Sequence, residues 1–296
     1  MIDISAQFHS ISRIIMLCAG TGIICHVAFH GDKLVPINRF HYFLHWLYGK
    51  YEPQILRICD WFLSRKSIYG NPVGRMLLKL VAMASWYLPH GIIVTTRSAI
   101  NLLRFIEGLQ SGEDGPRIAV GPCVCQMSLD RWKEPSCKDI VVLYGADIYL
   151  HLQRGYRIIK AAEAQQILES CRDAGLVHSL DFCMQSGKWH FVVCNCDSEI
   201  CVITRVFFLT HRMLYTGPQI AKQDKSLCLG AEACGKCVAA CMFRANYVKE
   251  GKVYLDGKKC MGCGQCVRQC KGNAREMVTR KNYKHDKIIP SEILVR

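Results

Sequence analysis

The N-terminal zone of the chain, residues 1–112, is rich in aliphatic and aromatic side chains and poor in acids. Its apolar positions recur at helical spacing and predict three helices, over residues 53–63, 75–87 and 98–109. Pro53 would stand in the first turn of the first helix, where the missing N–H of proline has no helical partner to lose. We therefore expect this zone to be a helical region.

The two longest apolar runs of this zone are residues 14–29 and residues 80–94. Both are shorter than the roughly twenty residues that a membrane-spanning helix needs, and Pro89 interrupts the second run. Buried core helices are the interpretation that we prefer. The alternative is a docking face that lies against a membrane surface or a partner protein.

The middle zone, residues 113–217, follows a turn-rich linker and alternates between strand and helix patterns. A short strand is expected over residues 117–120, and an amphipathic helix over residues 161–174. Two further strands, residues 177–184 and 189–194, are joined by a polar turn. This order predicts a small α/β middle domain.

The last zone, residues 218–282, contains an internal repeat, and a basic tail follows over residues 283–296. Three cysteines of the first copy recur 29 residues later, so that Cys234, Cys237 and Cys241 correspond to Cys263, Cys266 and Cys270. Self-similarity at a fixed displacement indicates a duplicated structural unit. The chain as a whole is therefore predicted to be α+β, with three successive regions.

Composition adds a strong positive charge to this picture. The 296 residues carry a formal net charge of +14, while half of them are hydrophobic and only 21% are charged. A surplus of this kind favours an acidic partner, a nucleic acid or an anionic membrane face. The low share of charged residues suggests that some of the surface is covered by a partner or touches a membrane.

Nineteen cysteines are far more than an average chain of this length contains. They gather in C-x-C and C-x-x-C runs, which place sulfurs around one metal centre rather than for pairing across a fold. No small-x-small cleavage site follows the apolar run at residues 14–28. We expect a reducing, cytoplasmic location.

The second copy of the repeat is Cys260-Met-Gly-Cys263-Gly-Gln-Cys266-Val-Arg-Gln-Cys270. Three cysteines at this spacing can wrap a loop around one face of a cubane, each thiolate binding one iron. Gly262 and Gly264 permit the positive φ angles that such a loop needs. Two zinc knuckles are the alternative, but they need no triple run followed by a distal fourth cysteine.

At this point residues 222–278 resemble the bacterial two-cluster ferredoxin domain, a pseudo-twofold βαβ fold. In that family the fourth cysteine of each copy ligates the other cluster. The resemblance therefore implies two [4Fe–4S] clusters, one held by Cys228, Cys234, Cys237 and Cys270, the other by Cys260, Cys263, Cys266 and Cys241.

Two departures from the family pattern affect details. Five residues separate Cys228 from Cys234 where the family has two, and Met242 and Lys271 replace the proline that usually follows each fourth cysteine. The longer loop should change solvent access and hydrogen bonding at the first cluster. We expect the two clusters to differ in reduction potential.

A second set of six cysteines lies in the middle zone, as Cys123, Cys125, Cys137, Cys194, Cys196 and Cys201. With the Ala-Gly-Leu-Val-His segment that ends at His178, this set resembles larger ferredoxin-domain proteins of anaerobes, although Gln126 replaces an arginine and three cysteine positions are changed. The six thiols are enough for one more metal centre. A third iron–sulfur cluster, a zinc site and buried free thiols all stay open.

The residues thus favour an iron–sulfur protein that relays single electrons as a subunit or partner of a larger redox complex. No dinucleotide fingerprint, phosphate loop or nucleophile elbow is present in the sequence. Residues 222–296 hold sixteen Lys/Arg against seven Asp/Glu, which favours a redox partner with an acidic surface. We expect no nucleic-acid partner, because the basic residues lie on no nucleic-acid-binding module.

Two other functions remain as alternatives. The protein could be a catalytic subunit whose additional cluster binds substrate, or an iron- or redox-sensing regulator that binds nucleic acid. Residues 1–112 could also touch the cytoplasmic face of a membrane peripherally.

Overall fold

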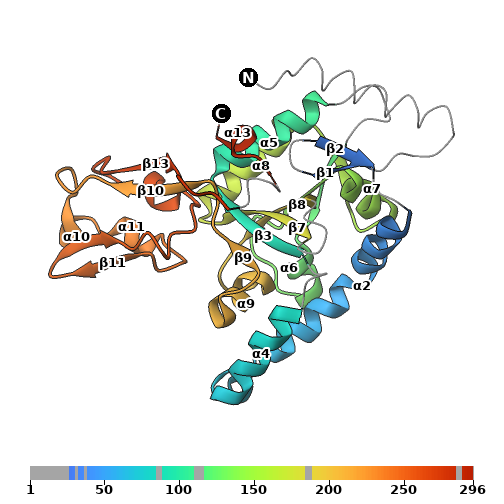
Figure 1. Cartoon of the computed structure of the whole chain (residues 1–296), viewed down its shortest axis with the longest axis horizontal. Coiled ribbons are helices and arrows are strands. Elements are labelled where there is room, and N and C mark those ends of the chain that lie inside the picture. Colours follow the sequence, from blue (N-terminus) through green and yellow to red (C-terminus); the bar gives the residue numbers. More distant parts are fainter. Residues whose placement is uncertain are drawn as a thin grey trace.

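The computed structural model describes residues 27–30, 33–36, 39–84, 89–109, 117–183, 189–284 and 289–295. Helices and strands are mixed throughout these residues, which confirms the predicted α+β class. A large sheet with helices against it forms the main body, and a smaller lobe made from residues after 217 extends from one end of it (Figure 1).

Nine strands make up the large sheet, and the order along its main path is β6-β4-β5-β8-β7-β3-β9. The pair β1 and β2 is attached at the side, through a bridge between Phe29 and Trp189. All pairs are antiparallel except β3 with β9. The strands are β1 (Val27–His30), β2 (Lys33–Pro36), β3 (Pro89–Val94), β4 (Ile118–Pro122), β5 (Cys137–Val142), β6 (Arg157–Ile159), β7 (Val177–Cys183), β8 (Trp189–Cys196) and β9 (Leu214–Tyr215).

Helices pack on both sides of this sheet (Figure 1). One side carries α5 (Thr96–Gly108), α8 (Ala161–Asp173) and α13 (Ser291–Leu294). The other side carries α2 (Arg39–Leu63), α6 (Val124–Leu129), α7 (Tyr144–His151) and α9 (Val202–Thr210), with α3 (Lys66–Tyr69) and α4 (Pro72–Ala84) beyond the end of α2.

The core follows from the strand pattern. Ile140, Val141, Val142 and Leu180 in the central strands are fully buried, and Leu102 and Leu103 of α5 pack into the same hydrophobic cluster. Runs of β-branched and aliphatic residues of this kind are typical of strands that are covered on both faces.

The boundary expected at residue 112 does not separate two folded units. Strand β3 pairs along its whole length with β7, and α5 packs against α8. The apolar run at residues 80–94 divides into the end of α4 and the strand β3, with residues 85–88 outside the described residues. A short apolar run fits a buried strand as well as a helix, and the long-range partner β7 decides between them.

The helix expected to start at Pro53 begins earlier, at Arg39, and contains Pro53 in its interior. A proline there leaves the carbonyl of Gly49 without its helical N–H donor. Arg154 supplies the donors instead, from Nη1 to the Gly49 oxygen at 2.7 Å and from Nη2 to the Lys50 oxygen at 2.7 Å. The side chain of Arg154 therefore lets α2 continue through the proline.

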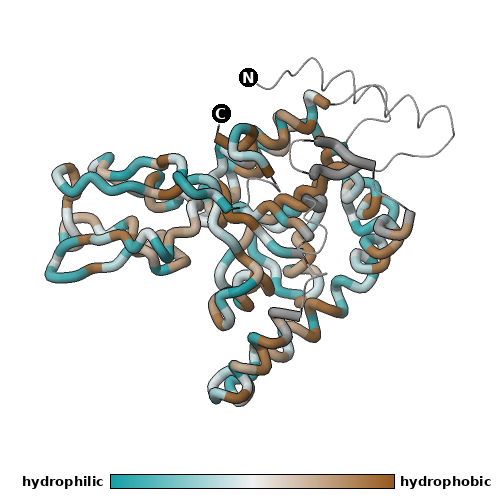
Figure 2. The backbone as a smooth tube through the Cα atoms, in the orientation of Figure 1, coloured by the Kyte–Doolittle hydropathy of each residue, from teal (hydrophilic) through white to brown (hydrophobic). Residues whose placement is uncertain are grey.

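Hydrophobic residues occur along much of α2 and α4 (Figure 2), and several of their side chains are exposed. Among them, Ile58 and Trp61 of α2 are 60% and 50% exposed, and Val73 of α4 is 70% exposed. Among the described residues, no helix combines the length and the apolar character needed to cross a bilayer.

Candidate metal centres

The smaller lobe consists of two antiparallel strand pairs joined by cysteine-bearing loops. Strand β10 (Gln219–Gln223) pairs with β13 (Arg275–Thr279), and β11 (Asn246–Lys249) pairs with β12 (Lys252–Leu255). Three single-turn helices carry or flank the cysteines, and they are α10 (Gly230–Ala233), α11 (Lys236–Ala239) and α12 (Gln265–Arg268). The two repeats thus fold into two similar halves.

One cavity of this lobe, which we call the inner cavity, is lined by Cys241, Cys260, Cys263 and Cys266. Burial raises the pKa of Cys263 to about 12 and that of Cys266 to about 11. Such thiols stay protonated at neutral pH until a metal replaces the proton. Three of these cysteines come from the second copy, and Cys241 comes from the first.

The other cavity, the outer cavity, is lined by Cys228, Cys234, Cys237 and Cys270. Three of its four cysteines are partly exposed, against two of the four at the inner cavity, and the surroundings of Cys234 are electropositive. The backbone N–H groups of Lys236 and Lys271, together with the charges of both lysines, lower the pKa of Cys234. The two cavities therefore offer different electrostatic environments.

The two copies exchange their last cysteines in the same way. Cys241 Sγ accepts a hydrogen bond from the Ala245 backbone N–H at 3.2 Å, and Cys270 Sγ accepts one from Ala274 at 3.2 Å. Each of these cysteines follows a single-turn helix of its own copy and lines the cavity of the other copy. The five-residue spacer after Cys228, three residues longer than in the ferredoxin family, contains α10 and leaves all four cysteines at the outer cavity.

Arg275 lies between the two cavities and is only 6% exposed. Its charge opposes the rise that burial causes in the pKa values of Cys237, at the outer cavity, and Cys266, at the inner cavity. Its Nη1 atom is buried without a hydrogen-bond partner among the described residues. A buried guanidinium with a free donor, lining a cavity of thiols, suits an anionic group that accepts hydrogen bonds.

A third cavity, the middle cavity, has a volume of about 230 Å³ and lies between the large sheet and the helices α2, α4 and α9. Five of the six predicted cysteines of the middle zone line it, and these are Cys123, Cys125, Cys194, Cys196 and Cys201. The sixth, Cys137, is exposed at the start of β5 and does not line the cavity.

These thiols lie at the ends of three secondary-structure elements, β8, α9 and α6. Cys194 and Cys196 alternate with Asn195 at the end of β8, so both point to the same face of the sheet. Cys201 immediately precedes α9, while Cys123 and Cys125 stand at the start of α6. Because strands and helices end around the same point, C-x-C pairs that are far apart in the sequence meet there.

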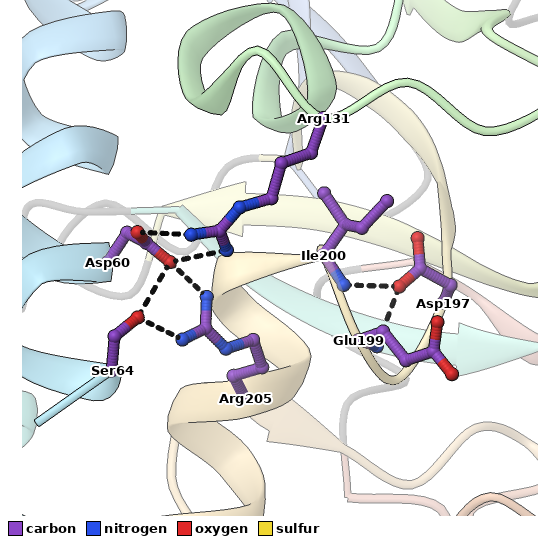
Figure 3. Close-up of polar contacts among 7 residues, drawn as sticks. All are labelled: Asp60, Ser64, Arg131, Asp197, Glu199, Ile200 and Arg205. Atoms are coloured by element: carbon purple, nitrogen blue, oxygen red, sulfur yellow. Dashed lines mark hydrogen bonds and ion pairs between the residues drawn. The ribbon is translucent and has the colours of Figure 1, made fainter. Parts of the chain in front are cut away.

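A turn stabilised by Asp197 carries the chain from Cys196 to Cys201. One carboxylate oxygen of Asp197 accepts hydrogen bonds from the backbone N–H groups of Glu199 at 2.7 Å and Ile200 at 2.5 Å (Figure 3). This hydrogen bonding holds the turn in one shape and brings Cys201 back towards β8.

Asp60 of α2 links this helix to two other segments near the cavity. Its carboxylate accepts two hydrogen bonds from Arg131, at 3.1 and 3.2 Å, and forms an ion pair with Arg205 of α9 (Figure 3). Arg205 also donates to Ser64 at 3.0 Å. The helices α2 and α9 and the segment after α6 are thereby tied together over the cysteines.

The His178 side chain ties the sheet to α5 on the opposite face. Its Nε2 atom lies 2.9 Å from Thr96 Oγ1, and its Nδ1 atom lies 2.6 Å from Asn195 Oδ1. Burial lowers the pKa of His178 to about 4, so the ring is neutral. Because Asn195 separates Cys194 from Cys196, this contact holds the cysteine-bearing end of β8 in register.

The thiols of the middle cavity are neighbours in one packed cluster. Cys196 and Cys201 are buried members of a hydrophobic cluster against which Cys125 and Cys194 pack, and Cys123 is not part of it. The neighbouring thiols of Cys125 and Cys196 lower the pKa of Cys201 despite its burial. The thiol of Cys194 lies 3.5 Å from a carboxylate oxygen of Asp181.

Buried carboxyl groups next to these thiols were not predicted from the sequence. Burial raises the pKa of Asp181 to about 8, that of Asp139 to about 6, and that of Glu52 to about 7. Asp139 and Asp181 lie inside the apolar strands β5 and β7. A single acidic residue in an apolar strand is the sequence feature that could have predicted these buried carboxyl groups. Glu52 lies in an amphipathic helix and gave no such signal.

Within the described residues, no three His, Cys, Asp or Glu side chains are gathered tightly enough to hold a single metal ion. This applies to the eight C-terminal cysteines as well as to the middle set. In an iron–sulfur cubane each iron takes one thiolate, so the four sulfurs surround the cluster and do not meet at one ion.

Residues 253–276 match the family described as the 4Fe-4S binding domain. No curated protein and no solved structure matches the chain. The match covers β12, α12 and the first part of β13, with Cys260, Cys263, Cys266 and Cys270. The C-terminal lobe therefore contains an iron–sulfur domain of ferredoxin type with the capacity to transfer electrons.

Proposed function

We propose that the protein is an electron carrier that passes single electrons through two [4Fe–4S] clusters, one in the inner and one in the outer cavity. The observation that carries the proposal is the crossed arrangement of cysteines, because each cavity is lined by three cysteines of one copy and the last cysteine of the other. When bound, each cluster supplies a one-electron redox couple.

The residues around the two cavities fit such anionic clusters. The guanidinium of Arg275, buried between both cysteine sets with a free donor, would offset negative charge that appears when either cluster is reduced. The inner cavity is more enclosed by burial, whereas the outer cavity is flanked by Lys236 and Lys271. We expect the outer cluster to have the higher potential, because positive charge and solvent favour the reduced, more negative state.

The first test is metal content. Anaerobically purified and reconstituted full-length protein should contain at least eight iron atoms and eight acid-labile sulfides per chain, as two [4Fe–4S] clusters require. Reduction should produce the EPR signals of two interacting centres. A reproducible content near four in fully reconstituted protein would exclude the two-cluster proposal.

We further propose that a redox partner with an acidic surface docks at the outer cavity. Leu227 and Leu229, which are 51% and 53% exposed, lie beside the cavity, and the exposed Lys236 and Lys271 flank Cys234. An apolar patch with basic neighbours next to the more accessible centre suits a brief, electrostatically steered encounter. The peripheral membrane contact of α2 and α4 stays a prediction, which vesicle co-sedimentation would measure.

Charge reversal tests the docking proposal. The double variant Lys236→Glu, Lys271→Glu should slow electron transfer from an acidic flavodoxin at least tenfold at low salt, and the difference should shrink as salt is added. The double variant Lys281→Glu, Lys284→Glu makes the same change of net charge in the segment after β13. If both variants slow the reaction equally, only net charge acts and the outer cavity is not the docking site.

A further inference from the structure

The middle cavity contains a concentration of metal-binding side chains that the two-cluster function does not use. Four cysteines, from the start of α6, the end of β8 and the start of α9, meet in one packed cluster: Cys196 and Cys201 are buried in it, and Cys125 and Cys194 pack against it. No disulfide joins any of these cysteines. All four line a single cavity.

We propose that Cys125, Cys194, Cys196 and Cys201 hold a third iron–sulfur cluster, placed to exchange electrons with the cluster of the inner cavity. None of the ligands of this site belongs to the C-terminal repeat, whereas the electron exchange with the inner cavity rests on the proposed function. Cys123 and Cys137 are excluded from the ligand set: Cys123 does not belong to the packed cluster that contains the other four cysteines, and Cys137 is exposed away from the cavity.

The first argument concerns the space. Protein interiors are close-packed, and voids much larger than a water molecule are few. Here a cavity of about 230 Å³ is bounded on its sheet side by thiols and by the carboxyl groups of Asp139 and Asp181. Buried free cysteines would normally pack against apolar side chains as small hydrophobic groups. The rest of the lining is mainly apolar, so the thiols and carboxyl groups gather on one wall beside open space, where a bound group would be ligated by the thiols.

The second argument concerns the surrounding structure, which holds the thiols at fixed positions. Asp197 shapes the turn between Cys196 and Cys201. Asp60 fastens α2 to α9 above the cavity, and His178 holds Asn195 between the two cysteines of β8. Ligands that are supported by a second layer of hydrogen bonds are typical of metal centres.

The third argument favours iron and sulfide over zinc, and it rests on the position of the cavity. Cys196 and Cys201 belong to a hydrophobic cluster that also contains Phe243 and Met261 of the smaller lobe, with Cys241 and Cys263 packed against it. The ring of Phe207 in α9 lies 5.8 Å from the ring of Phe243. The cysteines of the middle cavity and of the inner cavity thus share one continuous packed layer.

Further contacts hold the two lobes together at this layer. Gln265 of α12 donates hydrogen bonds to the backbone oxygens of Leu176 at 2.6 Å and Arg172 at 3.2 Å. The Gly217 N–H donates to the Met261 oxygen at 3.0 Å. Zinc has no redox chemistry, so its function would not depend on a short distance to the inner cavity. A one-electron centre in the middle cavity would extend electron transfer from the outer cavity through the inner cavity to the middle cavity.

The test uses the full-length protein, reconstituted anaerobically, in a background that lacks the C-terminal clusters. This background is a quadruple variant with the substitutions Cys234→Ala, Cys241→Ala, Cys260→Ala and Cys270→Ala. It should still bind two to four iron atoms per chain and an equal number of sulfides. Adding Cys201→Ser or Cys196→Ser should abolish this residual iron and its charge-transfer absorption. Adding Cys137→Ser or Cys123→Ser should leave both unchanged.

Unmodified protein provides a measurement that does not depend on the folding of any variant. Its iron and sulfide should exceed eight of each per chain, and its reduced EPR spectrum should contain a signal that survives in the C-terminal cysteine variant. Eight iron atoms with no further metal would overturn the proposal in favour of free thiols. One zinc per chain that Cys201→Ser removes would overturn it in favour of a zinc site. Failure of the C-terminal clusters alone would leave the residual iron in place and so contradict only the two-cluster function.

Discussion

Replacing Cys241 with alanine should remove the cluster of the inner cavity and leave the cluster of the outer cavity in place. Cys241 belongs to the first copy of the repeat, yet it lines the inner cavity with three cysteines of the second copy. A cubane that loses one of four thiolates is exposed to exchange and oxidation at that iron. We expect four fewer iron atoms per chain and the loss of the EPR signal of the inner cluster.

The reciprocal variant Cys270→Ala is the matched control, because Cys270 occupies the same position in the second copy and lines the outer cavity. It should remove the outer cluster and keep the inner one. The two variants would then show different residual spectra with the same iron content. Should Cys241→Ala instead abolish the signal that Cys228→Ala also abolishes, ligation would follow the sequence copies and the crossed arrangement would be wrong.

The repeat shows what spacing alone can and cannot predict. A displacement of 29 residues, read with the x2 and x3 intervals, identifies six cysteines as a set, and Cys228 and Cys260 precede the two copies at unequal distances. It does not say which cavity the fourth cysteine of each copy lines, and resemblance to a family supplied that expectation. The crossing follows from the pairing of β10 with β13, which brings the two ends of the lobe together. Such long-range pairing is not encoded in any local pattern.

The large sheet combines strands from the N-terminal and middle zones, which the division of the sequence by composition had separated. Residues 89–94 lie in an apolar run that continues a helix pattern, and their strand partner β7 starts more than eighty residues later. By contrast, the helix expected at residues 161–174 and the strand expected from residue 177 are found as α8 and β7, because amphipathic spacing and the cap at Gly175 are local signals.

Both the sequence motifs and the folded structure were needed to identify the candidate ligands of the middle cavity. The two C-x-C pairs indicated a centre, since chance alone seldom produces them, but the sequence could not select among six candidates. Folding removes Cys137 from the set, because it lies on the exposed end of β5. It also adds Asp139 and Asp181, because neighbouring strands present alternate residues on the same face as Cys194.

Replacing Gly262 with alanine should prevent the inner cluster from assembling and destabilise the smaller lobe by about 3–5 kcal/mol. Gly262 has a φ of +93°, a conformation that side chains with a Cβ rarely adopt. A Cβ at this position would lie 2.3 Å from the backbone oxygen of Gln219 in β10, which cannot swing aside as a long side chain could. The loop from Cys260 to Cys263 would have to move, and the cysteines at both of its ends line the inner cavity.

Gly257 supplies the matched control, because it lies three residues before Cys260 and its φ is not in the left-handed region. A Cβ there would meet only Ile220 Cδ1, at 3.5 Å, which is ordinary van der Waals contact. Gly257→Ala should therefore keep full iron content and unfold within about 0.5 kcal/mol of the unmodified protein. Anaerobic thermal unfolding followed by circular dichroism, with iron analysis of each variant, measures both effects. Equal iron content in the Gly262 and Gly257 variants would mean that the loop can relax away from β10, so that its close backbone contact is not required to hold the inner cluster.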